Sequence, residues 1–136
     1  MSKPIPVPFF SQKTSVGDEQ YYIAVSVYSN LLHILVTNDG KPGNCIQFIP
    51  HAQFGSDPTQ QYKIQSLLGE LTPLHELVIK QIASCATISS YAIPFLCHLK
   101  LSPQLHREDL TLLIHSIRTF IDSHQDDIKS CYQKIL

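Results

Sequence analysis

The sequence contains seven histidines, the residues best suited to a metal or proton-transfer site. His75-Glu76 opens like the His-Glu-x-x-His helix of zinc proteases, in which a histidine four positions on completes the ligand pair. Ile79 occupies that position here, and His106 and Cys97-His98 lack a second ligand at a useful spacing. Because metal sites need clustered ligands with supporting contacts, we expect no metal and no cofactor.

The other reactive groups do not form a catalytic arrangement. No Gly-x-Ser-x-Gly motif occurs, and Gly40-Lys41-Pro42-Gly43 lacks the Lys-Ser/Thr pair of a phosphate-binding loop. Asp39-Gly40 instead favours a hairpin turn. The adjacent carboxylates Glu108-Asp109 and Asp126-Asp127 would diverge on a helix. The sequence therefore predicts a protein that is not an enzyme.

Charge argues against nucleic acid and membrane partners. Ten Lys and Arg residues stand against eleven Asp and Glu, which gives a net charge of −1. Binding to a phosphate backbone needs a cluster of cations, and no basic residues interleave with Tyr21 and Tyr22 as a base-stacking surface would require. The apolar runs are much shorter than the roughly 20 residues of a membrane helix.

The four cysteines are expected to be free thiols that pack as small hydrophobic side chains. The spacing of Cys45, Cys85, Cys97 and Cys131 matches no compact disulfide framework, and the proline-rich N-terminus does not resemble a signal peptide. Cys85 and Cys131 are expected on the apolar stripes of helices. We expect the protein in the cytoplasm, with the nucleus as a second location.

The first half of the chain predicts strands. Residues 7–13, 21–28, 31–37, 45–49 and 62–68 are apolar or alternating segments, and turn residues separate most of them. The first four are expected to form a meander of antiparallel neighbours. Helical periodicity then runs from Leu74 to Cys85, with Thr72 as the N-cap and Pro73 at the first position. Residues 92–99 predict a sixth strand, in which Pro94 favours a sheet edge or an irregularity.

The last predicted element is a long helix from Leu110 to Leu136, which begins near Arg107-Glu108-Asp109. Two helices with one apolar stripe each need a sheet to cover. The sequence thus predicts that residues 1–136 form a single α+β domain. Its expected architecture is a two-layer sandwich, with a mainly antiparallel sheet of about six strands and two helices on one face.

Some predicted strands are apolar on both faces. In residues 31–37, Leu32, Ile34 and Val36 alternate with Leu31 and Leu35. Helices in one layer can cover only one of these faces. The second face is therefore expected to meet a similar sheet in a dimer, with these candidate interface residues: Leu31, Leu35, Tyr22 and Tyr28.

Several short strings resemble the proteasome assembly chaperone 3 family. They are Gln12-Lys13-Thr14, His33–Thr37 with the following Gly40-Lys41 and Gly43, Leu67-Leu68-Gly69-Glu70 with Pro73-Leu74, and Glu76–Ala83. The element order agrees from about Gln12 to Ile121. The loop after Pro50 and the helix beyond Ile121 depart from the family.

The resemblance implies pairing with a related chaperone, such as one like proteasome assembly chaperone 4. It also implies binding to α-type subunits while the α-ring of the 20S core particle forms. Partner-binding loops are expected at residues 38–43 and 50–58, with Asp39, Lys41 and Phe54 as candidate contacts. The sequence does not decide between a homodimer and a heterodimer. A longin- or profilin-like trafficking module is the alternative function, and a small cofactor-free enzyme is a third.

Overall fold

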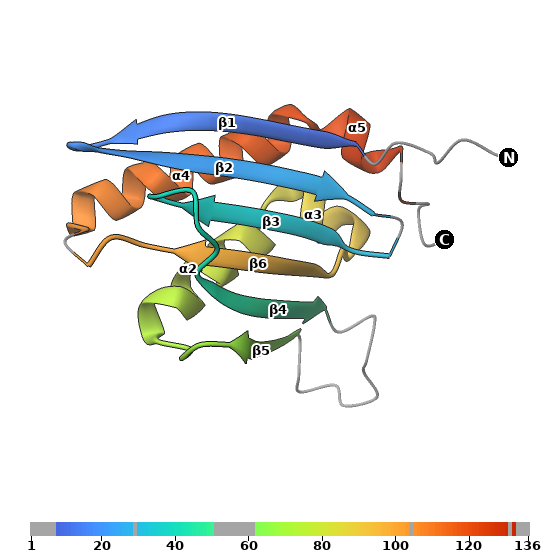
Figure 1. The fold of residues 1–136 in the computed structure, drawn as a ribbon. Coiled ribbons are helices and arrows are strands. Elements are labelled where there is room, and N and C mark those ends of the chain that lie inside the picture. The colour runs from blue at the N-terminus through green and yellow to red at the C-terminus, as the bar shows by residue number, and fades with distance from the viewer. Residues whose placement is uncertain (1–7, 29, 51–61, 104, 131, 133–136) are drawn as a thin grey trace, which may run out of the picture.

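The computed structural model describes residues 8–28, 30–50, 62–103, 105–130 and 132. Six strands form one sheet in the order β1-β2-β3-β6-β4-β5, and the helices lie together on one face of it (Figure 1). Four strand pairs are antiparallel, and the β3–β6 pair is parallel. The prediction of an α+β two-layer sandwich is confirmed. The elements are β1 (Phe9–Val16), β2 (Glu19–Val27), β3 (Leu32–Thr37), β4 (Asn44–Pro50), β5 (Tyr62–Leu68), α2 (Pro73–Ala83), α3 (Ala86–Tyr91), β6 (Phe95–Lys100), α4 (Arg107–Ser123) and α5 (Gln125–Lys129).

Strands β1, β2 and β3 are antiparallel neighbours, as predicted, and their alternation sets the two faces of the sheet. Ile23, Val25 and Val27 of β2 stand beside Val36, Ile34 and Leu32 of β3, and all six side chains are buried. They face the helices because residues two apart on a strand share a face. This side of the sheet joins the helices in one hydrophobic core.

The predicted meander is wrong at its fourth strand, because β6 lies between β3 and β4. Phe95, Cys97 and Leu99 of β6 are almost fully buried, because a central strand has a neighbouring strand on each side. Pro94 therefore does not mark a sheet edge. It precedes β6, so its missing N–H removes no bond from the ladder, and its carbonyl accepts a hydrogen bond from the Leu32 N–H at 3.0 Å.

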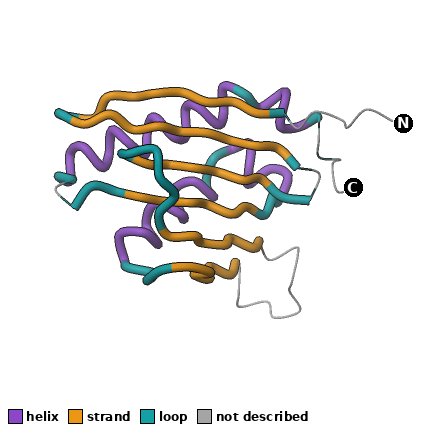
Figure 2. The backbone as a smooth tube through the Cα atoms, in the orientation of Figure 1, coloured by secondary structure: helices purple, strands orange, loops and turns teal. Residues whose placement is uncertain are grey.

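The Asn38–Gly43 segment is consequently not a hairpin turn. It leaves β3, passes the end of β6 and enters β4 (Figure 2). Within it, the Thr37 hydroxyl donates to the Lys41 carbonyl at 2.7 Å, and the Asp39 carboxylate accepts from the Lys41 N–H at 3.0 Å. Gly43 passes so close to the backbone of Leu99 that a Cβ atom would overlap the Leu99 carbonyl.

Helix α2 begins where the sequence predicts. The Thr72 side chain accepts a hydrogen bond from the His75 N–H at 3.2 Å, and Pro73 takes the first helical position. The helix ends at Ala83, short of the predicted Cys85, and the unpredicted helix α3 follows. Cys85 is the N-cap residue of α3 and is fully buried, so it does not lie on a helical stripe.

The single final helix predicted to reach Leu136 is also wrong. Helix α4 ends at Ser123, and the separate short helix α5 ends at Lys129. The break falls at His124, whose ring stacks on Phe10 of β1 at 4.2 Å between centroids and meets Phe120 edge-on at 5.0 Å. These ring contacts hold the chain against the sheet at the point where α4 ends. Residues 133–136 lie outside the described part.

Cys45, Cys85 and Cys97 are buried free thiols, while Cys131 lies outside the described residues. Burial raises the pKa of the Cys85 thiol to about 11 and also raises that of Cys97. These thiols are therefore held in their unreactive protonated form. Among the described helices, none is both long and apolar enough to span a bilayer.

Candidate interaction surface

The face of the sheet opposite the helices is the candidate site. We call its central side chains the open face, because no described helix covers them (Figures 1 and 2). The strand register arranges them in two rows across the sheet. The first row is Phe9, Ser26, His33, Leu96, Gln47 and Gln65, and the second is Ser11, Ala24, Leu35, His98 and Cys45.

Neither row contains a lysine, arginine or carboxylate. The charged side chains next to the rows on this face stand at its two ends. Lys13 and Lys100 lie beside Tyr22 and Thr37 at one end, and exposed Lys63 lies next to Gln65 of β5 at the other. Ala24 and Cys45 are buried, and Leu35 and Leu96 are half-buried. A core depleted of charge with cations at its margin is the composition of a protein–protein interface.

The structure separates the four predicted interface residues. Leu35 is central, in the second row of the open face. Leu31 and Tyr28 meet at the turn before β3, where the Tyr28 N–H donates to the Leu31 carbonyl at 3.1 Å. Tyr22 lies at the other end, opposite Thr37 and so about 20 Å along β3 from Leu31. The four residues therefore span the open face and do not form a cluster.

Of the two predicted partner-binding loops, the structure describes residues 38–43 but not residues 51–58. Asp39 forms an ion pair with Lys100, and this bond together with the Lys41 N–H lowers the pKa of the Asp39 carboxyl to about 2. The carboxylate thus holds the turn in place. Lys41 is exposed at the same turn. Phe54 lies outside the described residues.

Sequence reasoning missed a histidine pair at the centre of the open face. His33 and His98 are near neighbours on β3 and β6, and their rings meet edge-on at 4.7 Å between centroids. Nδ1 of His98 is buried and has no hydrogen-bond partner among the described residues. Burial, and then the neighbouring His33, lower the pKa of His98. The His98 ring is therefore neutral at neutral pH.

Acidification is expected to destabilise the fold through His98. The pKa of its imidazole lies below the ordinary value of 6.5 in the folded protein, so the unfolded chain takes up this proton first as pH falls. Stability contributed by the neutral ring is complete above pH 6.5 and declines below it. Urea unfolding of the wild type and of His98→Gln on both sides of pH 6.5 measures this. The wild type should lose more stability than the variant, and equal losses would contradict the assignment.

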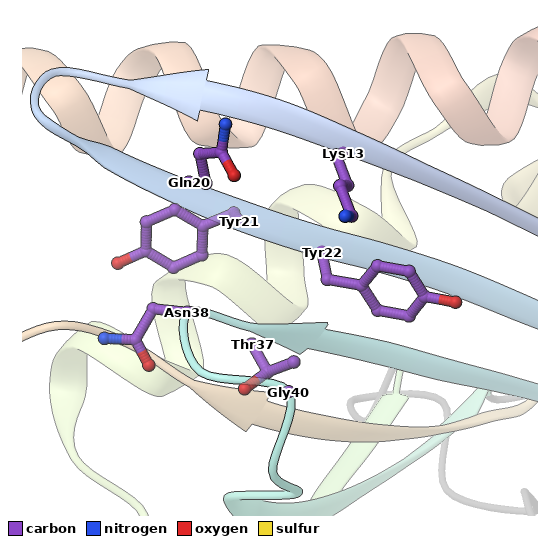
Figure 3. A pocket seen from close by; sticks show the side chains of 7 residues that line it. All are labelled: Lys13, Gln20, Tyr21, Tyr22, Thr37, Asn38 and Gly40. Atoms are coloured by element: carbon purple, nitrogen blue, oxygen red, sulfur yellow. The ribbon is translucent and has the colours of Figure 1, made fainter.

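A hollow of about 210 Å³ lies where the open face meets the Asn38–Gly43 turn (Figure 3). Lys13, Tyr22 and Asn38 line it, and Asn38 Oδ1 is buried there with no partner in the described part of the chain. Tyr21 also lines the hollow, and its hydroxyl accepts a hydrogen bond from the Ser102 N–H at 2.9 Å. An amine, a phenol and an amide can hold polar groups of a partner, but they do not make a nucleophile–base pair.

The fold is similar to that of a chain in a solved structure, which is described as a novel chaperone complex for yeast 20S proteasome assembly. That chain is 15% identical to this one. The match covers 83% of this chain and 98% of that chain, with a TM-score of 0.64. The two chains share a fold. No family model and no curated protein matches the sequence.

In the described part of this chain, no group of three His, Cys, Asp or Glu side chains could hold a metal ion. The features that this geometry does offer are the open face and the turn beside it.

Proposed function

We propose that this protein is a proteasome assembly chaperone that binds α-type subunits and promotes α-ring formation of the 20S core particle in the cytoplasm. The observation that carries the proposal is the likeness in fold to a chain of a 20S proteasome assembly chaperone complex, over 83% of this chain. The sequence strings that resemble proteasome assembly chaperone 3 support the same class independently.

The open face is the proposed dimer surface. Its partner is a related chaperone with a similar sheet, or a second copy of this chain. A stable interface buries about 800 Å² on each partner, and two sheets stacked about 10 Å apart can bury their facing side chains. Half-buried Leu35 and Leu96, with the paired rings of His33 and His98 beside them, suit such a dry contact.

Loops beside the dimer are the proposed contacts for an α-type subunit. The Asn38–Gly43 turn is held by the Asp39–Lys100 ion pair and the Thr37 hydrogen bond, which leaves Lys41 exposed on a fixed backbone. A rigid loop loses little conformational entropy on binding. The affinity must stay modest, because a chaperone bound at picomolar Kd would not leave the growing ring.

Capture from solution tests the proposed function. The tagged protein, co-expressed with a related chaperone, is offered isolated α-type subunits, assembly intermediates and mature core particle. We expect it to retain the subunits and intermediates at least about tenfold better than the mature particle, a difference of about 1.4 kcal/mol. Retention of none of them would favour the trafficking module.

A further inference from the structure

A second hollow lies on the helix layer, on the opposite side of the domain from the open face. We call it the helix groove. It has a volume of about 440 Å³ and runs between α2 and α4, lined by Leu77 and Gln81 of α2 and by Arg107, Leu110, Ile114 and Arg118 of α4. Helices α2 and α4 pack against each other, so the groove has a continuous base.

The middle of the groove is apolar and accessible. Leu77 is 43% exposed in it, Ile114 is half-buried, and Leu110 is nearly buried beneath. Leu74, one turn earlier on α2, is also exposed. Isolated exposed leucines are common on protein surfaces, but leucines gathered at a hollow between two helices can receive apolar side chains of a third helix.

Two arginines flank this apolar centre. Arg107 and Arg118 are eleven residues apart, or three turns, so they lie on one side of α4 about 16 Å apart along its axis. His115 lines the groove between them. Among the described residues, neither arginine forms an ion pair with a carboxylate. Arg118 does interact with the buried Cys85 thiol.

Three carboxylates of α2 and α4 either bond to other groups or do not line the groove. Glu76 of α2 pairs with Lys80 of the same helix at 3.2 Å. Asp122 of α4 accepts hydrogen bonds from the Thr87 hydroxyl at 2.8 Å and from its N–H at 3.3 Å. Glu108, which follows Arg107, does not line the groove. Arg107 and Arg118 thus stand at the two ends of the helix groove without an ion pair among the described residues.

We propose that the helix groove binds an amphipathic helix of a partner protein, with apolar residues at its centre and carboxylates near both ends. Charge complementarity selects the occupant, because Arg107 and Arg118 would each meet a carboxylate while Leu77 and Ile114 receive the apolar side chains. This contact goes beyond the proposed function. It leaves the open face free, so both surfaces can be occupied together.

Labelled helical peptides test the groove by fluorescence anisotropy on the full chain. The probe has leucines on one face and glutamates eleven residues apart, and the comparison peptide has the same composition with the glutamates four residues apart. We expect the first to bind at least about tenfold more tightly, and added salt to weaken it. Equal binding of both peptides, or binding of neither, would overturn the proposal.

Four variants locate the site. Arg107→Glu and Arg118→Gln are each expected to weaken the first peptide by at least about fivefold, and Leu77→Asp by about tenfold or more. Arg107→Glu should fold well, because an acidic residue suits the first turn of a helix. Leu112→Asp is the matched control, since Leu112 is 54% exposed on α4 but outside the groove lining. An equal loss in Leu77→Asp and Leu112→Asp would place the peptide elsewhere.

Displacement of the peptide by DNA or by anionic vesicles would show that the arginines serve another ligand class.

Discussion

Leu35→Asp is expected to convert the dimer into a folded monomer. Leu35 lies at the centre of the open face, between Ala24 of β2 and His98 of β6. In the monomer the new carboxylate can still reach water, because no described helix covers this face. In the dimer it would be buried without a cation, which costs several kcal/mol. We expect the Kd of dimerisation to rise by at least about 100-fold, or about 2.7 kcal/mol.

Sedimentation of the chain, alone and with a related chaperone, measures this effect. Gln47→Glu is the second variant, because it adds a charge at the centre of the face with little change in shape. Leu112→Asp on the helix layer is the control and should sediment like the wild type. A dimer that survives both Leu35→Asp and Gln47→Glu would show that the interface lies elsewhere.

Gly43→Ala is expected to reduce the free energy of unfolding by about 2 kcal/mol or more. The added methyl group would overlap the Leu99 carbonyl and the Lys100 side chain, so β4 could not lie beside β6 without a shift of the backbone. Gly40→Ala in the same turn is the matched control. Gly40 has a φ of +78° and no atom near its would-be Cβ, so its substitution costs only the left-handed conformation, about 1–2 kcal/mol.

Urea denaturation of both glycine variants separates the two causes. Gly43→Ala should be the less stable of the pair and should also weaken dimerisation, because a displaced β4 would disturb Cys45 and Gln47 on the open face. Equal stability of the two variants would mean that the close passage at Gly43 is not a constraint on the fold.

Local signals in the sequence predicted most of the elements. The cap at Thr72-Pro73 marked the start of α2, and the alternation in residues 31–37 predicted both a buried face and an open one. Strand β5 has its predicted bounds, Tyr62–Leu68. Each of these features depends on residues within a few positions of one another.

Features set by distant residues could not be predicted. The insertion of β6 between β3 and β4 depends on pairings of Leu32–Thr37 with Phe95–Lys100, about 60 residues apart in the chain. The histidine pair follows from that topology, because His33 and His98 meet only in the parallel register. The helix groove depends on the packing of α2 against α4, which are also distant in the chain. The break at His124 depends on a ring contact with Phe10 of β1.

Reconstitution of the α-ring tests the proposed chaperone function. Purified α-type subunits are mixed with this protein and a related chaperone, and complete rings are counted by native mass spectrometry over time. We expect faster ring formation with the wild type than without it, and little acceleration with Gln47→Glu, whose added charge should prevent the proposed dimer. Ring formation at the same rate with and without the wild-type protein would contradict the proposed function.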